Sequence, residues 1–438
     1  MRAFVNFSVF AIGCVCLSAC IFPSDAGKTE LRPPAEDSSI AGIRVRSFFN
    51  QGNGREWRLV FGQGSLENEA LRFIEPPMSA RLIATDTTSS IIEKILSPPE
   101  NLCGDVNVSL KVSAPSQENL SSVPHMSIRF IGGKSINESA EYTFQHLVRE
   151  IQLLHPSTWT RLNMAMRTFS ASPTFNCQNV SRVRIRLTAP PGLHDTVNMG
   201  QLSFFPSPLP QAVLLITEDD QWADFDTNGI PALRKHGFPA TIYANGGLMG
   251  TGTKMAIERL KVLQDSGGWT IANHLWIHDS ITSLSNDSAE RAIRMNADFL
   301  RNAGFTGYAH FAYPYGRVNR AKDSVVRLNC SSARLTVGWP QGEALPYADP
   351  YRLRVIGFLT GQVTLDMAKT AIRQLVNNRT AGIMGVHEIV ASGPLDGNKW
   401  RREDWEALMD FIRTFVDQGS LQVFSLEEFN RTYTSGLP

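Results

Sequence analysis

Hydrophobic and polar residues alternate along several short runs in the first half of the chain. Residues 106–112, 126–130 and 183–187 change from apolar to polar at nearly every second position, and turn-forming residues separate the runs. A period of two is typical of β-strands with one buried face, and several such runs without helical periodicity favour an antiparallel sandwich. Residues 198–205 form the last run. The pattern predicts an all-β sandwich over residues 40–206.

The pattern changes after this segment. Residues 206–210 read Pro-Ser-Pro-Leu-Pro, which predicts a stiff linker at a domain boundary. Residues 212–216 form a continuous apolar run, as expected of a strand buried on both faces, and helical periodicity follows at residues 230–236. Strand-like and helix-like segments keep alternating to residue 425. Repeated βα units predict a parallel sheet closed into a distorted (β/α) barrel over residues 210–433, with its chemistry at the carboxyl ends of the strands.

The first 19 residues have the features of a secretory signal peptide. A basic start precedes an apolar stretch over residues 3–17 that is too short for a transmembrane helix. Residues 17–20 (Leu-Ser-Ala-Cys) resemble the lipobox of bacterial lipoproteins, in which the cysteine, here Cys20, carries the lipid. The alternative is an ordinary signal peptide with small residues at its cleavage site.

The residues after Cys20 refine this expectation. Ile21 stands where retention in the inner membrane usually requires Asp. We therefore expect a lipid anchor in the outer membrane, facing the periplasm. Residues 28–39 are polar and contain proline, and we therefore expect residues 20–39 to form a flexible tether.

Charge and cysteine content narrow the classes of partner. The formal net charge is +1 without a basic run, so the chain lacks the electrostatic footprint of a nucleic-acid-binding protein, and a neutral glycan fits better. An oxidising compartment favours a disulfide between Cys103 and Cys177, with two buried thiols as the alternative. Cys330 is expected to be a buried thiol.

Candidate chemistry gathers at four predicted strand ends. The first strand runs into Asp219 and Asp220, and side chains of neighbouring strand residues point in different directions, so one carboxylate can bind metal while the other stays available as a base. His274 and His278, after the third strand, can reach one ion if their segment is helical. Residues 313–316 follow the fourth strand, and a late apolar run ends at His387.

These segments, in this order, resemble the motifs of the polysaccharide deacetylase family, also known as the NodB-homology domain or carbohydrate esterase family 4. Residues 217–221 resemble its Thr-Phe-Asp-Asp-Gly motif, and residues 274–278 resemble His-Ser/Thr-x-x-His. Residues 312–315 resemble Arg-x-Pro-Tyr, and the segment through His387 resembles Leu-x-His. Residues 311–316 (Phe-Ala-Tyr-Pro-Tyr-Gly) are most similar to the poly-N-acetylglucosamine deacetylase branch.

The resemblance implies a cofactor and a set of ligands. One divalent metal ion, usually zinc in this family and otherwise cobalt or nickel, would be bound by Asp220, His274 and His278. Three protein ligands leave a position open for water and substrate. Asp219 would act as the general base and His387 as the general acid.

The resemblance also implies residues that contact the substrate. A backbone N–H near Tyr315 would help to hold the oxyanion. We expect Tyr315, Tyr313 and Trp276 to line the substrate site. The predicted sandwich loosely resembles the jelly-roll, galactose-binding-like modules that accompany carbohydrate enzymes.

Four departures from the family pattern stand out. Glu218 replaces the usual Phe, and we expect it either to raise the pKa of Asp219 or to point into solvent. Gln221 replaces the usual Gly, and Ala312 stands where many members carry an Arg that orients the base. The family's Asp-x-x-Asp-Trp element, which tunes the acidic histidine, has no clean match, and Asp349 and Asp366 are weak stand-ins.

The expected activity is therefore removal of N-acetyl groups from a bacterial polysaccharide. An N-acetylated exopolysaccharide is the favoured substrate, and peptidoglycan is the closest alternative. Two rivals remain: an O-acetyl esterase that uses the same site, and a non-catalytic glycan-binding lipoprotein. Besides the glycan, the lipid anchor makes the membrane a partner, and the sequence leaves protein partners open.

Overall fold

A computed structural model describes most of the chain. It covers residues 44–48, 57–69, 79–85, 89–113, 125–144, 160–189, 194–338, 340–395 and 397–433. The predicted signal peptide, Cys20 and the tether lie outside the described residues and stay predictions. None of the helices in the described part is long and apolar enough to cross a membrane.

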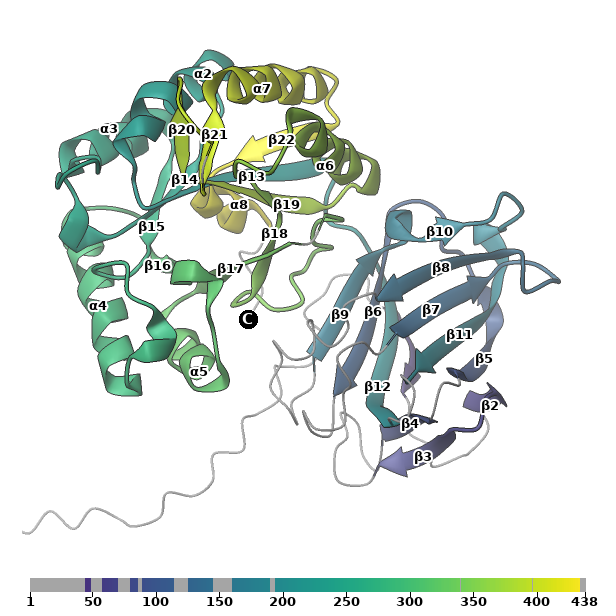
Figure 1. The fold of residues 1–438 in the computed structure, drawn as a ribbon. Helices are drawn as coiled ribbons and strands as arrows, with labels where there is room; N and C mark the ends of the chain where they lie inside the picture. Colours follow the sequence, from purple (N-terminus) through teal and green to yellow (C-terminus); the bar gives the residue numbers. More distant parts are fainter. Residues whose placement is uncertain are drawn as a thin grey trace, which may run out of the picture. The chain divides into compact units, whose positions relative to one another are not determined.

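The first half of the chain forms two antiparallel sheets of six strands each (Figure 1). One sheet has the order β3 (Ser65–Glu69), β4 (Ser79–Thr85), β12 (His194–Pro206), β6 (Val106–Ser113), β9 (Thr160–Ala165), with β1 (Arg44–Phe48) also paired to β12. The other has the order β10 (Ser170–Ala171), β8 (Ser139–Phe144), β7 (His125–Ile131), β11 (Val180–Thr188), β5 (Ser89–Glu100), β2 (Trp57–Phe61).

The two sheets pack face to face around one hydrophobic core. Along β11, Val183 and Ile185 are fully buried while the arginines that alternate with them are partly exposed, which is the predicted alternation. Phe130 on β7 meets Phe204 on β12 with ring centroids 5.7 Å apart, so side chains of both sheets interdigitate. The predicted all-β sandwich is confirmed.

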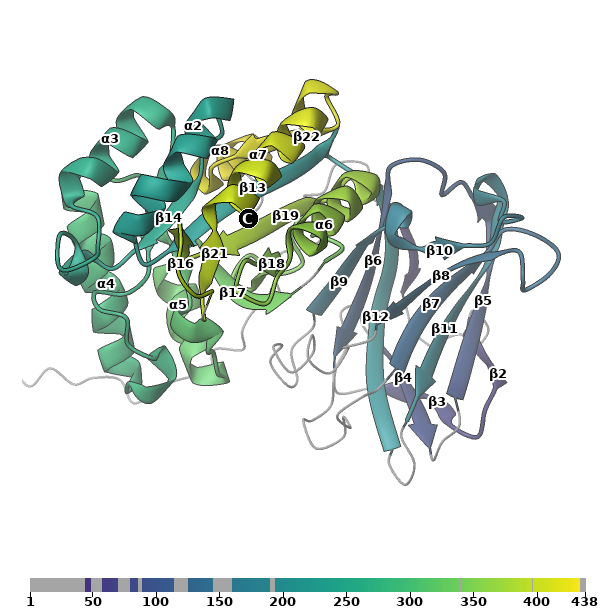
Figure 2. The same cartoon turned by 45° about the horizontal axis from the view of Figure 1, so that its top comes forward.

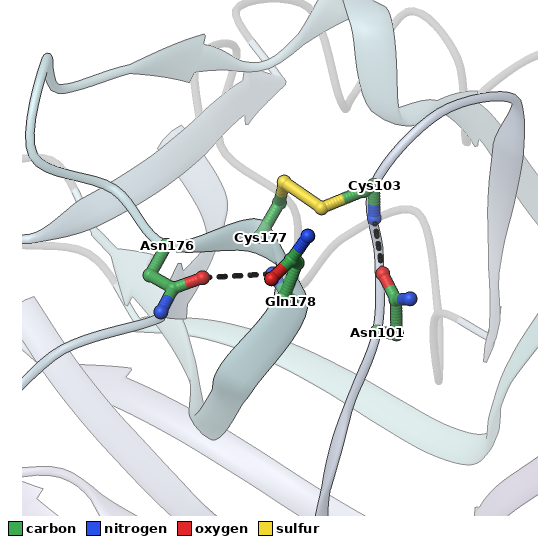
Figure 3. Close-up of a disulfide and its surroundings, with 5 residues drawn as sticks. All are labelled: Asn101, Cys103, Asn176, Cys177 and Gln178. Atoms are coloured by element: carbon green, nitrogen blue, oxygen red, sulfur yellow. Dashed lines mark hydrogen bonds between the residues drawn. A yellow bond between two sulfur atoms is a disulfide. The ribbon is translucent and has the colours of Figure 1, made fainter.

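The sandwich also contains the predicted disulfide (Figure 3). Cys103, after β5, is bonded to Cys177 in a short 3-10 helix, η5 (Cys177–Asn179), with the two Cα atoms 4.9 Å apart. The alternative of two buried thiols is thereby wrong. Cys330 is a free thiol, as expected, but it is only half-buried.

The second half of the chain forms a closed parallel barrel (Figure 2). Seven strands follow one another around it: β13 (Ala212–Asp219), β14 (Thr241–Ala244), β15 (Thr270–Asn273), β16 (Gly307–Ala312), β17 (Ser332–Gly338), β18 (Leu353–Phe358) and β19 (Ala381–Val386). The barrel closes because β13 pairs with β14 on one side and β19 on the other. β22 (Leu421–Phe424) pairs in parallel with the first residues of β13. The predicted (β/α) barrel is confirmed.

Helices of the barrel domain cover its strands and close its amino-terminal end. The helices are α2 (Ile230–His236), α3 (Ile257–Gly267), α4 (Asn286–Asn302), α5 (Arg320–Asn329), α6 (Leu365–Asn378), α7 (Arg402–Asp417) and α8 (Leu426–Tyr433). The backbone N–H of Leu426 donates to the hydroxyl of Thr241 at 2.9 Å, and that of Glu427 donates to the hydroxyl of Thr270 at 3.0 Å. Since both threonines begin barrel strands, α8 covers this end, and the opposite, carboxyl ends are left for the site.

Short elements complete the carboxyl-terminal end of the barrel. They are the π-helix η6 (Phe225–Gly229), the 3-10 helices η7 (Gly246–Leu248), η8 (Ile281–Ser283) and η9 (Pro314–Gly316), and the strand pair β20 (Glu388–Val390) and β21 (Lys399–Arg401). Each of η6, η7, η9 and β20 follows a barrel strand by a few residues.

Candidate metal centre and active site

The turn after β13 places the two predicted aspartates. Asp219 is the last residue of the strand, and the next two residues have positive φ angles, 79° at Asp220 and 47° at Gln221. A left-handed conformation costs a residue with a side chain about 1–2 kcal/mol, so the surrounding structure must stabilise this turn. The side chains of Asp219 and Asp220 consequently diverge, as the sequence predicted.

Glu218 supplies part of that stabilisation. Its carboxylate accepts hydrogen bonds from the backbone N–H groups of Gln221, at 3.1 Å, and Trp222, at 2.9 Å. Glu218 is fully buried, so the expectation that it points into solvent is wrong. Burial, with help from the charges of Asp220 and Asp219, raises the pKa of Glu218 well above its usual value.

Asp219 has a buried arginine partner that the motifs did not reveal. Nη2 of Arg334, on β17, lies 2.5 Å from Oδ1 and 2.6 Å from Oδ2 of Asp219. Burial would raise the pKa of this carboxyl, but the charge of Arg334, the neighbouring His274 and His387 and the hydrogen bond from Arg334 outweigh it, and the pKa of Asp219 is lowered. We expected Glu218 to raise the pKa of Asp219, but the net shift is downward, so this expectation is wrong.

Arg334 lies on the strand next to the position where the third motif usually has an arginine. Ala312, at the motif position, pairs in register with Arg334 on the neighbouring strand. The guanidinium lies between the rings of Tyr243 and Phe358, 4.8 and 5.3 Å from their centroids. The positive charge beside Asp219 therefore comes from β17, the strand next to the one that carries the motif. Only the pairing of β16 with β17 could indicate this.

The three predicted ligands converge. Oδ1 of Asp220 lies 3.6 Å from Nε2 of His274 and 3.5 Å from Nε2 of His278, and one ligand atom from each residue lies within 4.8 Å of the others. Ligands about 2.1 Å from a tetrahedral zinc ion lie about 3.4 Å from one another. Oδ1 of Asp220 is also buried without a hydrogen-bond partner among the described residues, as expected of an atom that binds a cation. The residues therefore fit a divalent metal.

The tautomer of His274 suits metal binding. Its Nδ1 lies 2.9 Å from the backbone carbonyl of Ala312, so Nδ1–H donates there and the lone pair of Nε2 faces Asp220. Burial, and then the neighbouring His274, lowers the pKa of His278, which favours the neutral, ligating form.

The two histidines reach one point by a route other than the predicted one. Residues 274–278 form a bend rather than a helix, and Leu275 has a φ of 68°. We expected His274 and His278 to come together only if their segment is helical, and that condition is wrong. The left-handed residue turns the chain so that the rings of His274 and His278 come within 4.9 Å of each other.

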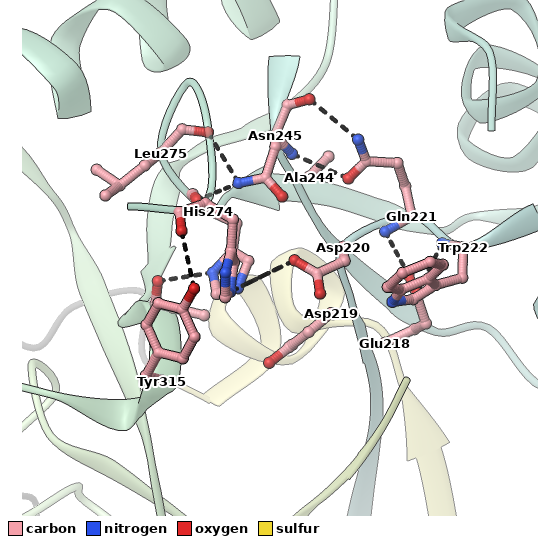
Figure 4. A network of polar contacts seen from close by, with 12 residues as sticks. Glu218, Asp219, Asp220, Gln221, Trp222, Ala244, Asn245, His274, Leu275 and Tyr315 are labelled. Carbon is pink, nitrogen blue, oxygen red and sulfur yellow. Dashed lines mark hydrogen bonds and ion pairs between the residues drawn. The ribbon is translucent and has the colours of Figure 1, made fainter. Parts of the chain in front are cut away.

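Tyr315 lies beside the metal ligands. Its hydroxyl donates to the backbone carbonyl of His278 at 3.3 Å, and its ring centroid is 4.4 Å from that of His278 (Figure 4). The side chain is 59% exposed, and the residue has a φ of 60°. No hydrogen bond from its backbone N–H is found in the part of the chain that the structure describes. Tyr315 is therefore placed to meet a substrate.

The other two residues expected at the substrate lie elsewhere. Tyr313 is only 1% exposed and packs against Phe311, with ring centroids 5.2 Å apart, so it is a core residue with no surface for a substrate to contact. Its predicted substrate role is wrong. Trp276 packs edge-on against Phe299 and is half-buried, and its role stays a prediction.

His387 directly follows β19, at the same end of the barrel as Asp219. Its ring centroid is 4.9 Å from that of Phe358, and its Nδ1 is buried without a hydrogen-bond partner among the described residues. Burial lowers the pKa of His387, while the charges of Asp219 and Asp220 act in the opposite direction. Asp349 instead hydrogen-bonds Arg327, and Asp366 lies in the first turn of α6, so neither stand-in is seen to bond His387.

A lysine not anticipated from the sequence completes the site. Nζ of Lys254 lies 4.0 Å from Oδ2 of Asp220 and 3.1 Å from the ring centroid of Trp222. Burial lowers its pKa, and the charges of Asp220 and Glu218 counter this. Lys254 thus offsets part of the negative charge at the end of β13.

Sequence comparison gives one family match. Residues 207–329 match the profile described as Polysaccharide deacetylase, a segment that contains Asp219, Asp220, His274 and His278 but not His387. No curated protein matches the chain.

Similar solved structures are found that cover part of the chain. One is the Streptococcus pyogenes deacetylase PplD in complex with acetate, at 23% identity over 32% of this chain and 63% of that one, with a TM-score of 0.29; the chain thus spans less than two thirds of it. Another is a family 4 acetyl xylan esterase from Clostridium thermocellum in complex with a cobalt ion, at 17% identity over 52% and 93% of the two chains, TM-score 0.35. A third is peptidoglycan deacetylase PdaC from Bacillus subtilis, at 17% identity over 51% and 91%, TM-score 0.32. Residues 207–329 are thus similar to the polysaccharide deacetylase family, and this segment contains the three residues that could hold a metal ion.

Proposed function

We propose that residues 210–433 hydrolyse N-acetyl groups of a bacterial polysaccharide that contains N-acetylhexosamine, with one divalent metal ion as cofactor. The observation that carries the proposal is the convergence of Asp220, His274 and His278 beside Asp219. A carboxylate and two imidazoles are a usual donor set for catalytic zinc, which we favour over cobalt or nickel. When bound, the metal would lower the pKa of a water molecule and polarise the acetyl carbonyl.

Asp219 is the residue suited to take a proton from the attacking water. Its carboxylate is buried at the strand end next to Asp220, and Arg334 keeps it ionised by lowering its pKa. An ionised carboxylate held in one orientation is ready to accept a proton without a preceding rearrangement. We therefore assign the general base to Asp219.

His387 and Tyr315 are suited to the later steps. The departing amine is a poor leaving group unless it is protonated, and His387 lies at the carboxyl end of β19 near Asp219, whose charge bears on its pKa. The backbone N–H of Tyr315 can donate to the negative oxygen that develops on the acetyl carbon. We assign the general acid to His387 and oxyanion stabilisation to Tyr315.

The experiment that tests the proposal is release of acetate by the purified protein. N-acetylglucosamine oligomers, de-O-acetylated beforehand, should release acetate. Release from O-acetylated xylan but not from these oligomers would favour the O-acetyl esterase. Release from neither, with retained binding to the oligomers, would favour the non-catalytic glycan-binding protein.

The substrate and location that we favour follow from the sequence. An exopolysaccharide is suggested by residues 311–316, and a panel that includes peptidoglycan and poly-N-acetylglucosamine would distinguish the two candidate polymers. We further propose that Cys20 carries a lipid that holds the protein on the periplasmic face of the outer membrane. Cys20→Ala should then move the protein from the membrane fraction to the soluble periplasmic fraction.

A further inference from the structure

Gln221 occupies a position whose backbone would suit glycine. Its φ of 47° is left-handed, and its side chain is fully buried. A buried amide at a strained position is unfavourable unless its donors and acceptors are paired. The contacts of this amide therefore indicate why the chain carries glutamine here.

The amide of Gln221 binds both backbone groups of one residue. Its Oε1 accepts from the backbone N–H of Asn245, at 2.9 Å, and its Nε2 donates to the backbone carbonyl of Asn245, at 3.0 Å (Figure 4). The side chain thus attaches the turn after β13 to the segment after β14. Since Gln221 directly follows Asp220, a displacement at this contact moves the carboxylate ligand.

The side chain of Asn245 continues the connection to the histidine turn. Its Nδ2 donates to the backbone carbonyl of His274 and, at 3.2 Å, to that of Leu275. Leu275 is the left-handed residue that brings the two histidines together. An unbroken chain of hydrogen bonds therefore joins the Asp220 turn to the His274 turn, entirely within buried residues.

We propose that Gln221 is a positioning residue that holds Asp220 and His274 at ligand distance before the metal binds. The proposal rests on the proposed metal site and concerns how its ligands are held. Restraint of this kind reduces the reorganisation that accompanies binding, so it contributes to metal affinity. Loss of the amide should therefore weaken metal binding more than it disturbs the fold.

The test compares two matched substitutions in the full chain. Gln221→Met keeps the buried volume and removes both hydrogen bonds. Gln264→Met is the control, because the Gln264 amide also bonds two backbone groups, accepting from Thr306 at 2.9 Å and donating to Gly304 at 3.0 Å, before β16 at the opposite end of the barrel. Zinc affinity is measured by calorimetry on the metal-free proteins, and the visible spectrum of the Co²⁺-loaded proteins reports ligand geometry.

We expect Gln221→Met to bind zinc about 10–100-fold more weakly and to change the cobalt spectrum, with Gln264→Met unchanged in both. Equal zinc affinity in wild type and Gln221→Met would overturn the proposal, as would equal losses in both variants. If Gln221→Met does not fold, Gln221→Gly replaces it, since glycine adopts this φ without strain. The same loss of affinity is expected there.

A double substitution tests whether the two residues act in series. Asn245→Ala removes the next link, so the combination with Gln221→Met should lose no more affinity than the more affected single variant. Additive losses would reject a shared connection. Zinc binding needs no glycan, so a wild type that binds zinc but releases no acetate would refute the proposed function alone, whereas a wild type that binds no zinc would refute the metal site itself.

Discussion

The guanidinium of Arg334 donates to both carboxylate oxygens of Asp219, at 2.5 and 2.6 Å. Both side chains are buried, and they come from strands that lie apart in the barrel, β13 and β17. A buried carboxylate without such a partner would gain a proton or be expelled into solvent. The pair thus allows Asp219 to remain ionised in a buried site.

Replacing this arginine should shift the acidic limb of the pH–rate profile. In Arg334→Gln, burial would no longer be opposed by the guanidinium, so the pKa of Asp219 would rise. Because the base must be deprotonated, activity would then be lost at a higher pH than in wild type. Profiles of kcat/KM against pH measure the shift.

Arg354→Gln is the control for this prediction. Arg354 also pairs with a carboxylate inside the barrel domain, Glu343, at 2.6 Å, but it is not seen to contact the site. We expect both variants to lose stability, about 3–5 kcal/mol where the remaining charge is buried. Only Arg334→Gln should move the acidic limb, and an unmoved limb would reject the role given to Arg334.

The two adjacent aspartates should separate into different phenotypes. Asp219→Asn should retain zinc and lower kcat by about 10²–10⁴, because the base is lost but the ligands remain. Asp220→Asn should bind zinc more weakly, because the negatively charged carboxylate of the ligand becomes a neutral amide. Zinc content and kcat on one substrate are measured for both variants. Normal turnover in Asp219→Asn would show that another group accepts the proton.

His387 should matter for amides but not for esters with good leaving groups. His387→Gln should lower kcat on N-acetylglucosamine oligomers by about 10²–10⁴, because the amine leaves unprotonated. Nitrophenolate departs without a proton, so hydrolysis of 4-nitrophenyl acetate should change little. An equal loss on both substrates would indicate a structural effect rather than loss of an acid.

Removal of the metal should abolish activity and lower thermal stability together. A chelator should stop acetate release, and added zinc or cobalt should restore it. A metal present at 100 times its Kd stabilises the folded state by about 2.7 kcal/mol, so the melting temperature should rise with zinc concentration. Asp220→Asn is the control, and a zinc-dependent rise that persists in this variant would place the metal elsewhere.

Loss of the disulfide should destabilise the sandwich. Cys103 and Cys177 are 74 residues apart in sequence, and a cross-link over such a loop removes about 4.5 kcal/mol of chain entropy from the unfolded state. The Cys103→Ser and Cys177→Ser double variant should melt at a lower temperature than wild type. Cys330→Ser, which removes a free thiol, should not produce the same loss.

Much of the fold and half of the site follow from local patterns. Val183 and Ile185 alternate with arginines because one face of β11 is buried, and the apolar run at the start of β13 reflects a strand enclosed on both faces. Such periodicity depends only on residues that are close together in the sequence, so it predicts the strands and their order along the chain. The candidates Asp220, His274 and His278 lie at predicted strand ends, where chemistry in a barrel is found, and the resemblance to the deacetylase motifs assigned them to the metal.

Contacts between distant segments could not be read in this way. Tyr313 and Tyr315 share one motif, yet Tyr313 belongs to the core and Tyr315 lies at the surface beside His278, because the chain turns at Tyr315, whose backbone is left-handed. The connection from Gln221 to Asn245 likewise joins segments that no local pattern links.

The sequence by itself determined which residues are able to bind a metal and move protons, and at the end of which strand each of them lies. Only the tertiary structure decided that the charge on Asp219 is balanced by Arg334, which comes from a strand that does not adjoin β13 and lies opposite Ala312 of β16. The physical reason is that hydrogen-bonding character and hydrophobicity belong to each residue, whereas partners across a sheet depend on register, which is settled when all the strands close together into the barrel.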